Sequence, residues 1–327
     1  MTVTVHDGST AEVYAKEKGY TIQYFEGETD TAGTIAEGTC GEKLTWKLDE
    51  NGLLVISGTG DMANYRQDYK QTNPPWYDCR EAITNVVIED GVTGIGSYAF
   101  YDCTSLANVA IGNGVTDIGM WAFSFCSRLT SITLPDGVTG IGGYAFSNCE
   151  SLTSITIPES VTNIEDCAFQ SCSSLTHITI PEGITWLGKS LFWDCDSLTS
   201  ITIPASVEFI CYSAFASCDS LTDIVIPAST AIVENWAFAE CTSLNEITFL
   251  GDAPEIGEEV FLEVTATAYY PAGNPTWTAV WTDNGDGTFT TAECVGEGPQ
   301  IAGFWENNSI VWQLLNDNCA VPVKADD

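Results

Sequence analysis

The sequence predicts a mainly β solenoid in which the chain winds in coils of equal length. One observation is an apolar residue, usually followed by proline, that recurs at a constant interval: Ile88, Ile111, Leu134, Ile157, Ile180, Ile203, Ile226 and Phe249. Another is a phenylalanine with the same interval: Phe100, Phe123, Phe146, Phe169, Phe192, Phe215, Phe238 and Phe261. Eight copies without an insertion indicate stacked coils that share a core, and we expect this solenoid over residues 83–264.

Each copy divides into inward and outward positions. The inward positions of one copy are Leu152, Ile155, Ile157, Val161, Ile164, Ala168, Phe169 and Cys172. Pro158 ends the first strand of this copy because proline has no N–H to donate to a strand ladder. A single copy cannot bury its apolar face alone, so the copies must stack.

The stretch before the repeats predicts three segments. Residues 1–26 indicate a small αβ stub, with a strand, a helix that starts at the capping box Ser9 to Glu12, and a second strand. Residues 27–38 are polar and are expected to form a linker. In residues 39–82, Leu44, Trp46 and Leu48 alternate before a turn, which predicts a β-hairpin followed by a loop. A hairpin at this place would cap the open edge of the first coil.

Residues 265–327 predict a C-terminal cap of β or mixed structure. Within it, residues 282–288 resemble a calcium loop, but Asp283 and Asp286 do not fall on the odd positions that such a loop requires. We interpret them as a hairpin turn and expect neither a metal nor a cofactor.

The charge narrows the range of partners. The chain has 45 acidic and 10 basic residues, a net charge of −35, which repels phosphate backbones and anionic lipids. No run of 18 apolar residues is present, so we expect no nucleic-acid binding and no membrane insertion. The acidity favours a soluble, monomeric chain. An acidic site for a basic partner is the alternative.

The cysteines predict a row of thiols, not a disulfide framework. Seven of them follow the interval of the repeat: Cys103, Cys126, Cys149, Cys172, Cys195, Cys218 and Cys241. Stacked strands are about 4.8 Å apart, whereas a disulfide needs converging Cβ atoms about 3.8 Å apart. We expect buried thiols, with Cys79 starting the row. A bridge between Cys294 and Cys319 follows from no spacing rule.

The pattern LxxIxIPxxVxxIxxxAFxxCxx resembles the BspA-like leucine-rich repeat of bacterial surface proteins. This resemblance implies a right-handed leucine-rich repeat solenoid with a β-hairpin N-terminal cap and a β-rich C-terminal cap. It also implies a secreted or surface-anchored protein, some relatives of which adhere to host matrix or to other cells. The stub at residues 1–26 is similar to the end of a preceding array, so we interpret the chain as part of a longer protein. No catalytic motif belongs to this family, and we expect no enzyme.

The outward positions that vary between copies are the candidates for binding. One of them holds, in successive copies, Gly94, Asp117, Gly140, Asn163, Trp186, Phe209 and Ile232. The last three are large and apolar, and Trp193 and Tyr212 likewise replace small or polar residues in their own slots. We interpret these five as a patch for a protein partner on a host, another cell or matrix. Aromatic rings also suit sugars, so a carbohydrate-binding module is the alternative. In the structural alternative, the side chains pack under a loop or cap.

His177 is a further candidate contact, because it replaces serine in an outward strand slot. No nucleophile motif surrounds it. Asp223 and Glu246 occupy successive copies of the same slot and form the carboxylate pair that an enzyme would use. A solvated acidic face is the interpretation that we favour. The sequence therefore predicts a non-enzymatic extracellular binding or adhesion module.

Overall fold

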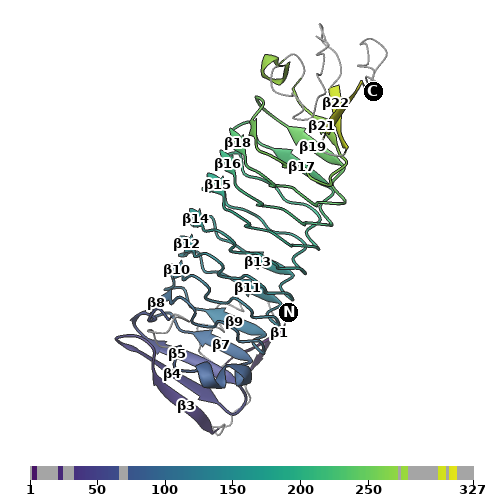
Figure 1. The fold of residues 1–327 in the computed structure, drawn as a ribbon. Coiled ribbons are helices and arrows are strands. Elements are labelled where there is room, and N and C mark those ends of the chain that lie inside the picture. The colour runs from purple at the N-terminus through teal and green to yellow at the C-terminus, as the bar shows by residue number, and fades with distance from the viewer. Residues whose placement is uncertain are drawn as a thin grey trace. The chain divides into compact units, whose positions relative to one another are not determined.

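The computed structural model describes residues 2–5, 21–24, 33–65, 73–271, 274–278, 301–306 and 309–314. These residues form short β-strands together with the 3-10 helices η1 (Tyr77–Ala82) and η2 (Pro275–Thr278). The chain divides into two compact units, residues 1–163 and 164–327. In each unit the sequence repeats wind as successive coils of a β-solenoid (Figure 1).

The first unit builds its coils from two rows of strands. The first row contains β3 (Thr34–Thr39), β4 (Leu44–Asp49), β5 (Leu53–Gly58), β7 (Asn85–Ile88) and β9 (Asn108–Ile111), followed by the pair β11 (Ser131–Thr133) and β13 (Ser154–Thr156). The second row contains β6 (Gly60–Asp61), β8 (Val92–Ile95), β10 (Asp117–Ile118), β12 (Gly140–Ile141) and β14 (Asn163–Ile164). From β7 on, parallel partners are one repeat apart, as in Ser131↔Ser154. The strands β1 (Thr2–Val5) and β2 (Thr21–Tyr24) pair in parallel.

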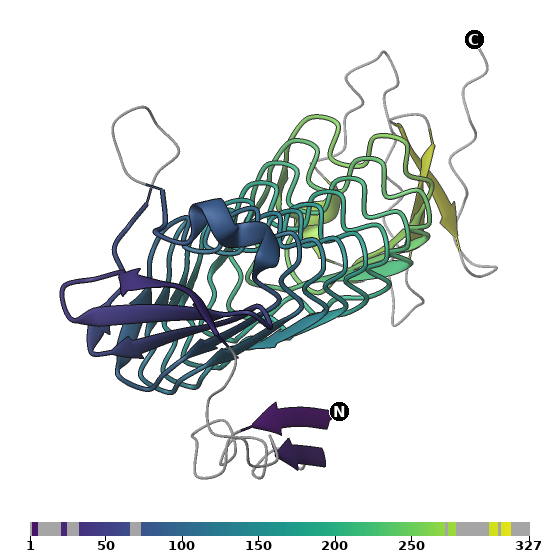
Figure 2. The same cartoon turned by 90° about the horizontal axis from the view of Figure 1, so that it is seen from below.

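The expected N-terminal hairpin is confirmed as β4 and β5, which pair antiparallel. The Asp49 carboxylate closes the turn by accepting from the backbone N–H groups of Asn51 and Leu53 at 2.9 and 2.8 Å. Gly52 completes the turn with a φ of 79°. Because β5 pairs in parallel with β7, the hairpin continues the sheet of the first coils. In Figure 2, η1 lies on the other side of the coils of this unit from the strands β3, β4 and β5.

The structure differs from two expectations in this region. β3 begins at Thr34, inside the stretch 27–38 that we interpreted as a linker, because it pairs antiparallel with β4. Trp76 lies in the predicted loop, but its side chain is buried and its Nε1 donates to the Ala99 carbonyl at 2.7 Å. The expected helix near residues 9–18 lies outside the described residues.

The second unit repeats the same construction. One row contains β15 (Trp186–Leu187), β16 (Phe209–Ile210), β18 (Ile232–Val233) and β20 (Glu255–Ile256), all parallel. The other contains β17 (Asp223–Ile226), β19 (Glu246–Phe249), β21 (Thr267–Tyr269), β22 (Ile301–Glu306) and β23 (Ser309–Leu314). β22 and β23 pair antiparallel after the parallel strands, which confirms a β-rich C-terminal cap. The expected turn at 282–288 and the residues Cys294 and Cys319 lie outside the described residues.

Stacked aromatic rings fill the centre of both units. In the first unit, Trp76, Phe100, Phe123 and Phe146 stack with successive ring centroids 5.6, 5.1 and 5.4 Å apart. In the second unit the rings of Phe169, Phe192, Phe215, Phe238 and Phe261 stack at 5.7, 5.4, 5.1 and 5.5 Å. These phenylalanines are almost fully buried, so within each unit every coil contributes one ring to the core.

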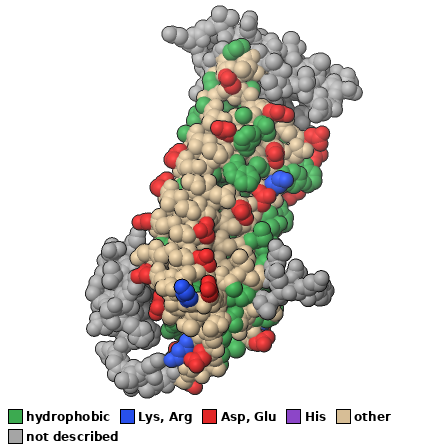
Figure 3. Space-filling view, turned by 90° about the vertical axis from the view of Figure 1, so that its left-hand side faces the viewer, with side chains coloured by type: hydrophobic (Ala, Val, Ile, Leu, Met, Phe, Trp, Pro, Cys, Tyr) green, Lys and Arg blue, Asp and Glu red, His purple; other side chains and the backbone are tan. Residues whose placement is uncertain are grey.

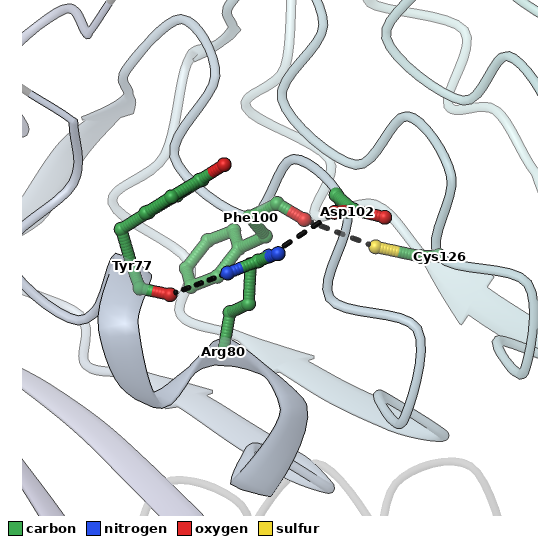
Figure 4. Close-up of polar contacts among 5 residues, drawn as sticks. All are labelled: Tyr77, Arg80, Phe100, Asp102 and Cys126. Atoms are coloured by element: carbon green, nitrogen blue, oxygen red, sulfur yellow. Dashed lines mark hydrogen bonds and ion pairs between the residues drawn. The ribbon is translucent and has the colours of Figure 1, made fainter.

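The expected row of free, buried cysteines is confirmed. Their spacing did not predict that the thiols also donate hydrogen bonds between coils. The Sγ of Cys126 donates to the carbonyl of Phe100 at 3.2 Å, which ties one coil to the preceding one (Figure 4). Cys149, Cys195, Cys218 and Cys241 make the same bond within their units. Cys79, which we expected to start the row, is only half-buried. In its place Arg80 of η1 caps the first coil, with Nε 3.1 Å from Asp102 and Nη1 donating to the Tyr77 carbonyl (Figure 4).

Two positions of every coil adopt a left-handed backbone conformation without glycine. The first holds Tyr98, Trp121, Tyr144, Cys167, Ser190, Ser213, Trp236 and Glu259, and the second holds Asp102, Phe125, Asn148, Ser171, Asp194, Ser217, Glu240 and Glu263. At these positions the backbone N–H points along the stack, as where Ser190 donates to the Tyr212 carbonyl at 2.8 Å. The positive φ is therefore part of how successive coils bond outside the strands.

Candidate binding surface

Trp186, Phe209 and Ile232 form a row on the outside of the second unit. They lie on β15, β16 and β18 as direct partners in the parallel register, Trp186↔Phe209 and Phe209↔Ile232. Adjacent parallel strands are about 4.8 Å apart, so the three side chains are neighbours. We call these three residues the apolar ladder.

The apolar ladder is accessible. The side chain of Phe209 is 40 % exposed, and those of Trp186 and Ile232 are half-buried. The residues that follow them, Leu187, Ile210 and Val233, point inward and are fully buried. The inward residues fill the core of these coils, and the ladder residues lie on the outside, with Phe209 the most exposed of the three.

Further aromatic residues lie in the turns that follow the strands of the apolar ladder. Trp193 and Tyr212 are 38 % and 40 % exposed, and the Tyr212 ring packs against the ring of Trp236 with centroids 5.6 Å apart. Sequence reasoning missed Trp236, because its slot holds aromatic residues in the first copies and therefore looks structural. The signal that could have found it is the serine at the same slot in the two preceding copies, Ser190 and Ser213.

The side chains next to the tryptophan of this slot differ between the two units. In the first unit, Trp121 lies between Tyr98 and Tyr144, and both rings stack on it, with centroids 5.9 and 4.1 Å away. Trp236 has Ser213 and Glu259 at the corresponding positions, so no ring of its own slot covers its faces. Its side chain is 41 % exposed, and Nε1 donates to the Glu259 carboxylate at 2.7 Å. The indole is held in place with accessible ring surface.

His177 does not join this group. It is exposed, and the hydroxyl of Thr176 is 3.0 Å from its Nδ1. Its slot is that of Asp223 on β17, and Figure 1 shows β17 and β19 on the opposite side of the coils from β16 and β18. A surface formed by the apolar ladder therefore excludes His177.

Asp223 and Glu246 are neighbours on β17 and β19, as the repeat predicts. Both are exposed to solvent, whereas catalytic carboxylates usually lie in clefts. Among the residues that the structure describes, no three His, Cys, Asp or Glu side chains gather as a metal site. This row is a solvated acidic face.

Carboxylates surround the apolar ladder and Trp236. Glu255 on β20 is the direct partner of Ile232, and Glu234 accepts from the backbone N–H of Tyr212 at 2.8 Å. The described part of the second unit contains a single basic residue, Lys189, in the slot of Tyr212 one copy earlier. Figure 3 shows hydrophobic side chains gathered on this face, with acidic side chains and a basic side chain beside them. The surface is apolar and aromatic with a negative rim.

The chain belongs to the BspA-type leucine-rich repeat family. The family model for the BspA type leucine rich repeat region, which holds six copies, matches residues 76–196 and 139–268, together more than half of the chain. The fold is therefore a leucine-rich repeat β-solenoid. Comparison with curated proteins finds no significant match.

Several solved structures of bacterial leucine-rich repeat proteins are similar. One from Eubacterium ventriosum is 24 % identical, with 76 % of this chain and 79 % of that chain covered and a TM-score of 0.44. The leucine-rich repeat protein of T. pallidum is 28 % identical, with 56 % and 90 % covered and a TM-score of 0.44. A leucine-rich cell surface protein of Faecalibacterium prausnitzii is 21 % identical, with 79 % and 100 % covered and a TM-score of 0.26.

None of the helices formed by the described residues is long and apolar enough to cross a bilayer.

Proposed function

We propose that this chain is a non-enzymatic binding module, secreted or held at a bacterial cell surface, that recognises a protein partner through the apolar ladder. The observation that carries the proposal is the contrast along one strand: Phe209 is 40 % exposed, whereas the next residue, Ile210, is fully buried. The coil needs Ile210 for its core and does not need Phe209.

The physical properties of the ladder support this role. Contiguous exposed apolar surface usually marks a contact site, and tryptophan is among the residue types enriched in the few positions that supply most of the binding energy of protein interfaces. A solenoid also presents neighbouring outward positions in a fixed register, which gives a partner a rigid surface. The extracellular location is an expectation from the family, whose repeats occur in bacterial surface proteins.

Binding of the purified chain to immobilised basement-membrane extract tests the proposal. We expect the wild-type chain to bind and the double variant Trp186→Ala/Phe209→Ala to lose binding with its melting temperature nearly unchanged. Val225→Ala is a matched control, because Val225 is 43 % exposed on β17, in the other row of strands. The control should bind as the wild type does. Equal binding by all three proteins would contradict the role of the ladder.

A carbohydrate-binding module is the second candidate, favoured by the exposed rings of Trp193 and Tyr212. A glycan array distinguishes the two candidates. Binding to defined glycans that is lost in Trp193→Ala or Tyr212→Ala, without binding to the protein matrix, would replace the first proposal by the second.

A further inference from the structure

We propose that the partner of this surface is a cationic protein segment, in which lysine or arginine side chains alternate with apolar ones. This inference rests on the proposed function and adds the chemistry of the partner. The cationic side chains would lie on Trp236 between carboxylates, and the apolar side chains would lie on the apolar ladder.

The rim of the surface is acidic. Glu234, Glu255 and Glu259 lie beside the aromatic and apolar residues, and two of them are already fixed by hydrogen bonds, Glu234 to the backbone of Tyr212 and Glu259 to the indole of Trp236. One basic residue, Lys189, lies in the copy of Trp186 and one copy before Tyr212, so the three carboxylates outnumber the basic residue beside the surface. A cationic partner is attracted and an anionic one is repelled.

Trp236 is a ring on which a cation could bind. A tryptophan face binds an ammonium or guanidinium group through its π-electrons, and this attraction is largest for tryptophan among the aromatic residues. The stacked Trp121 in the first unit has both faces occupied by tyrosines, whereas Trp236 has Ser213 and Glu259 in its own slot and one tilted ring beside it, that of Tyr212, with centroids 5.6 Å apart. The bond from Nε1 to Glu259 leaves ring surface accessible and brings a carboxylate to the edge of the indole. A cation bound to this face would contact both the ring surface of Trp236 and the carboxylate of Glu259.

The two parts of the surface are close along the chain. Tyr212 follows Phe209 by three residues, and Trp236 follows Ile232 by four residues. An extended chain covers about 3.3 to 3.6 Å per residue, so the ladder and the aromatic pair are within reach of one short peptide. A segment that alternates charged and apolar side chains matches this arrangement.

Fluorescence anisotropy with labelled synthetic peptides tests the inference on the full chain. The probes are a twelve-residue peptide of alternating Lys and Leu, its Glu/Leu counterpart, and a Lys/Ser counterpart that keeps the charge without the apolar side chains. We expect the Lys/Leu peptide to bind at least about tenfold more tightly than either counterpart, and its affinity to fall as the salt concentration rises.

Three variants locate the contact. Trp236→Ser introduces the residue found at the same slot in the two preceding copies, so the coil accepts it; we expect at least about a tenfold loss of Lys/Leu affinity. Glu255→Gln/Glu259→Gln removes two charges and should weaken binding about three- to tenfold. Asp223→Asn/Glu246→Gln removes the same charge from the other row of strands, and we expect less than a twofold change.

The outcomes separate this inference from the proposed function. Equal losses for the two carboxylate pairs, or equal binding of the Lys/Ser peptide, would show only general attraction to an acidic chain and would overturn the inference. It also fails if Trp236→Ser binds the Lys/Leu peptide normally, or if Trp236 instead proves to bind neutral glycans. If Trp186→Ala/Phe209→Ala still abolishes binding to the matrix in any of these cases, the proposed function stands and its partner has another chemistry.

Discussion

The cysteine of each coil shows how a single residue is fitted to the repeat. Its thiol is small enough for the corner of the coil, and it donates to a carbonyl of the preceding coil, as from Cys149 to Phe123 at 3.2 Å. Burial raises the pKa of the Cys149 thiol from 9.0 to about 12, because the thiolate would lose its hydration in the core. The same cause raises the pKa of Cys103 to about 12.

This pKa shift predicts sensitivity to alkali. Above about pH 9 the thiol ionises in the unfolded chain but stays protonated in the folded one, so the unfolded state binds fewer protons. The stability that Cys149 contributes is complete below pH 9 and is lost as the pH rises towards 12. We expect the free energy of unfolding, measured by urea denaturation at a series of pH values with a reductant present, to fall over this range.

The variant Cys149→Ala should fall less steeply with pH than the wild type. Leu152→Ala is the control, because Leu152 is fully buried in the same coil and does not ionise. It should lower the free energy of unfolding at every pH and keep the wild-type slope. Identical slopes for the wild type and Cys149→Ala would contradict the assignment.

The left-handed positions give a second prediction for single residues. Ser190 has a φ of 49°, a conformation that costs a residue with a Cβ about 1–2 kcal/mol and glycine almost nothing. We expect Ser190→Gly to change the free energy of unfolding by less than about 1 kcal/mol, and Ser190→Val to lower it by more than about 1 kcal/mol. Ser200, an exposed residue without positive φ, is the control. There valine should be better tolerated than glycine, and the same order at both positions would refute the explanation.

At the scale of elements, the hairpin, the loop and η1 act together as a lid on the first coil. Trp76 extends the phenylalanine stack by one ring, and Trp46 packs edge-on against it with centroids 5.7 Å apart. The Trp76 indole also bonds the carbonyl of Ala99 in the first coil. The lid is therefore joined to the repeats by packing and by hydrogen bonding.

Trp76 variants test this connection. Trp76→Ala should cost about 3–5 kcal/mol because it empties the last place in the stack. Trp76→Phe should cost about 1–2 kcal/mol, because it keeps a ring but leaves the Ala99 carbonyl without its donor. Hydrogen exchange should show lost protection first in the coils nearest Trp76, since solenoid coils are stabilised by their neighbours. Uniform loss over the whole chain would contradict a local lid.

At the scale of the whole molecule, charge opposes compactness. The net charge of −35 is spread over the surface, and Asp223 and Glu246 even face each other across β17 and β19. Like charges at directly opposite strand positions are destabilising, and the effect weakens as salt shortens the range of the field. The repulsion also favours a chain that does not associate with its own copies.

We therefore expect the melting temperature to rise when NaCl increases from about 0.01 to 0.3 M, over which the screening length drops from about 30 Å to below 10 Å. Asp223→Asn/Glu246→Gln should melt higher than the wild type at low salt and gain less from added salt. A melting temperature that falls with salt would show that attractive ion pairs, not repulsion, dominate the surface.

Much of this molecule could be predicted from the repeat. Its constant interval places Phe209 and Ile210 on opposite sides of one strand, and it identifies every phenylalanine of the stack. The left-handed positions could not be predicted, because side chains as different as Trp121 and Ser190 occupy them and the requirement lies in the backbone. The repeat did not predict that Trp76 joins the stack, because Trp76 lies one residue out of register with Phe100 and the later phenylalanines.

The candidate surface was predicted less completely. The variation of one outward slot indicated Trp186, Phe209 and Ile232, since the periodicity shows which positions the core does not need. The periodicity also put His177 in a different slot, but it could not show that the strands of that slot lie on the opposite side of the coils. It placed Ser213 and Glu259 beside Trp236, but it could not show the contact with the Tyr212 ring, because that contact depends on how the turns arrange side chains in three dimensions.

In the proposed function, the inward positions hold the fold together and the apolar ladder is free to bind a partner. Two phenylalanines of one copy test it most directly: Phe209 in the ladder, and Phe215, which is fully buried between the rings of Phe192 and Phe238. By urea denaturation, Phe209→Ala should lower the free energy of unfolding by less than about 1 kcal/mol and Phe215→Ala by about 3–5 kcal/mol. Equal losses at the two positions would show that the ladder belongs to the core and would contradict the account.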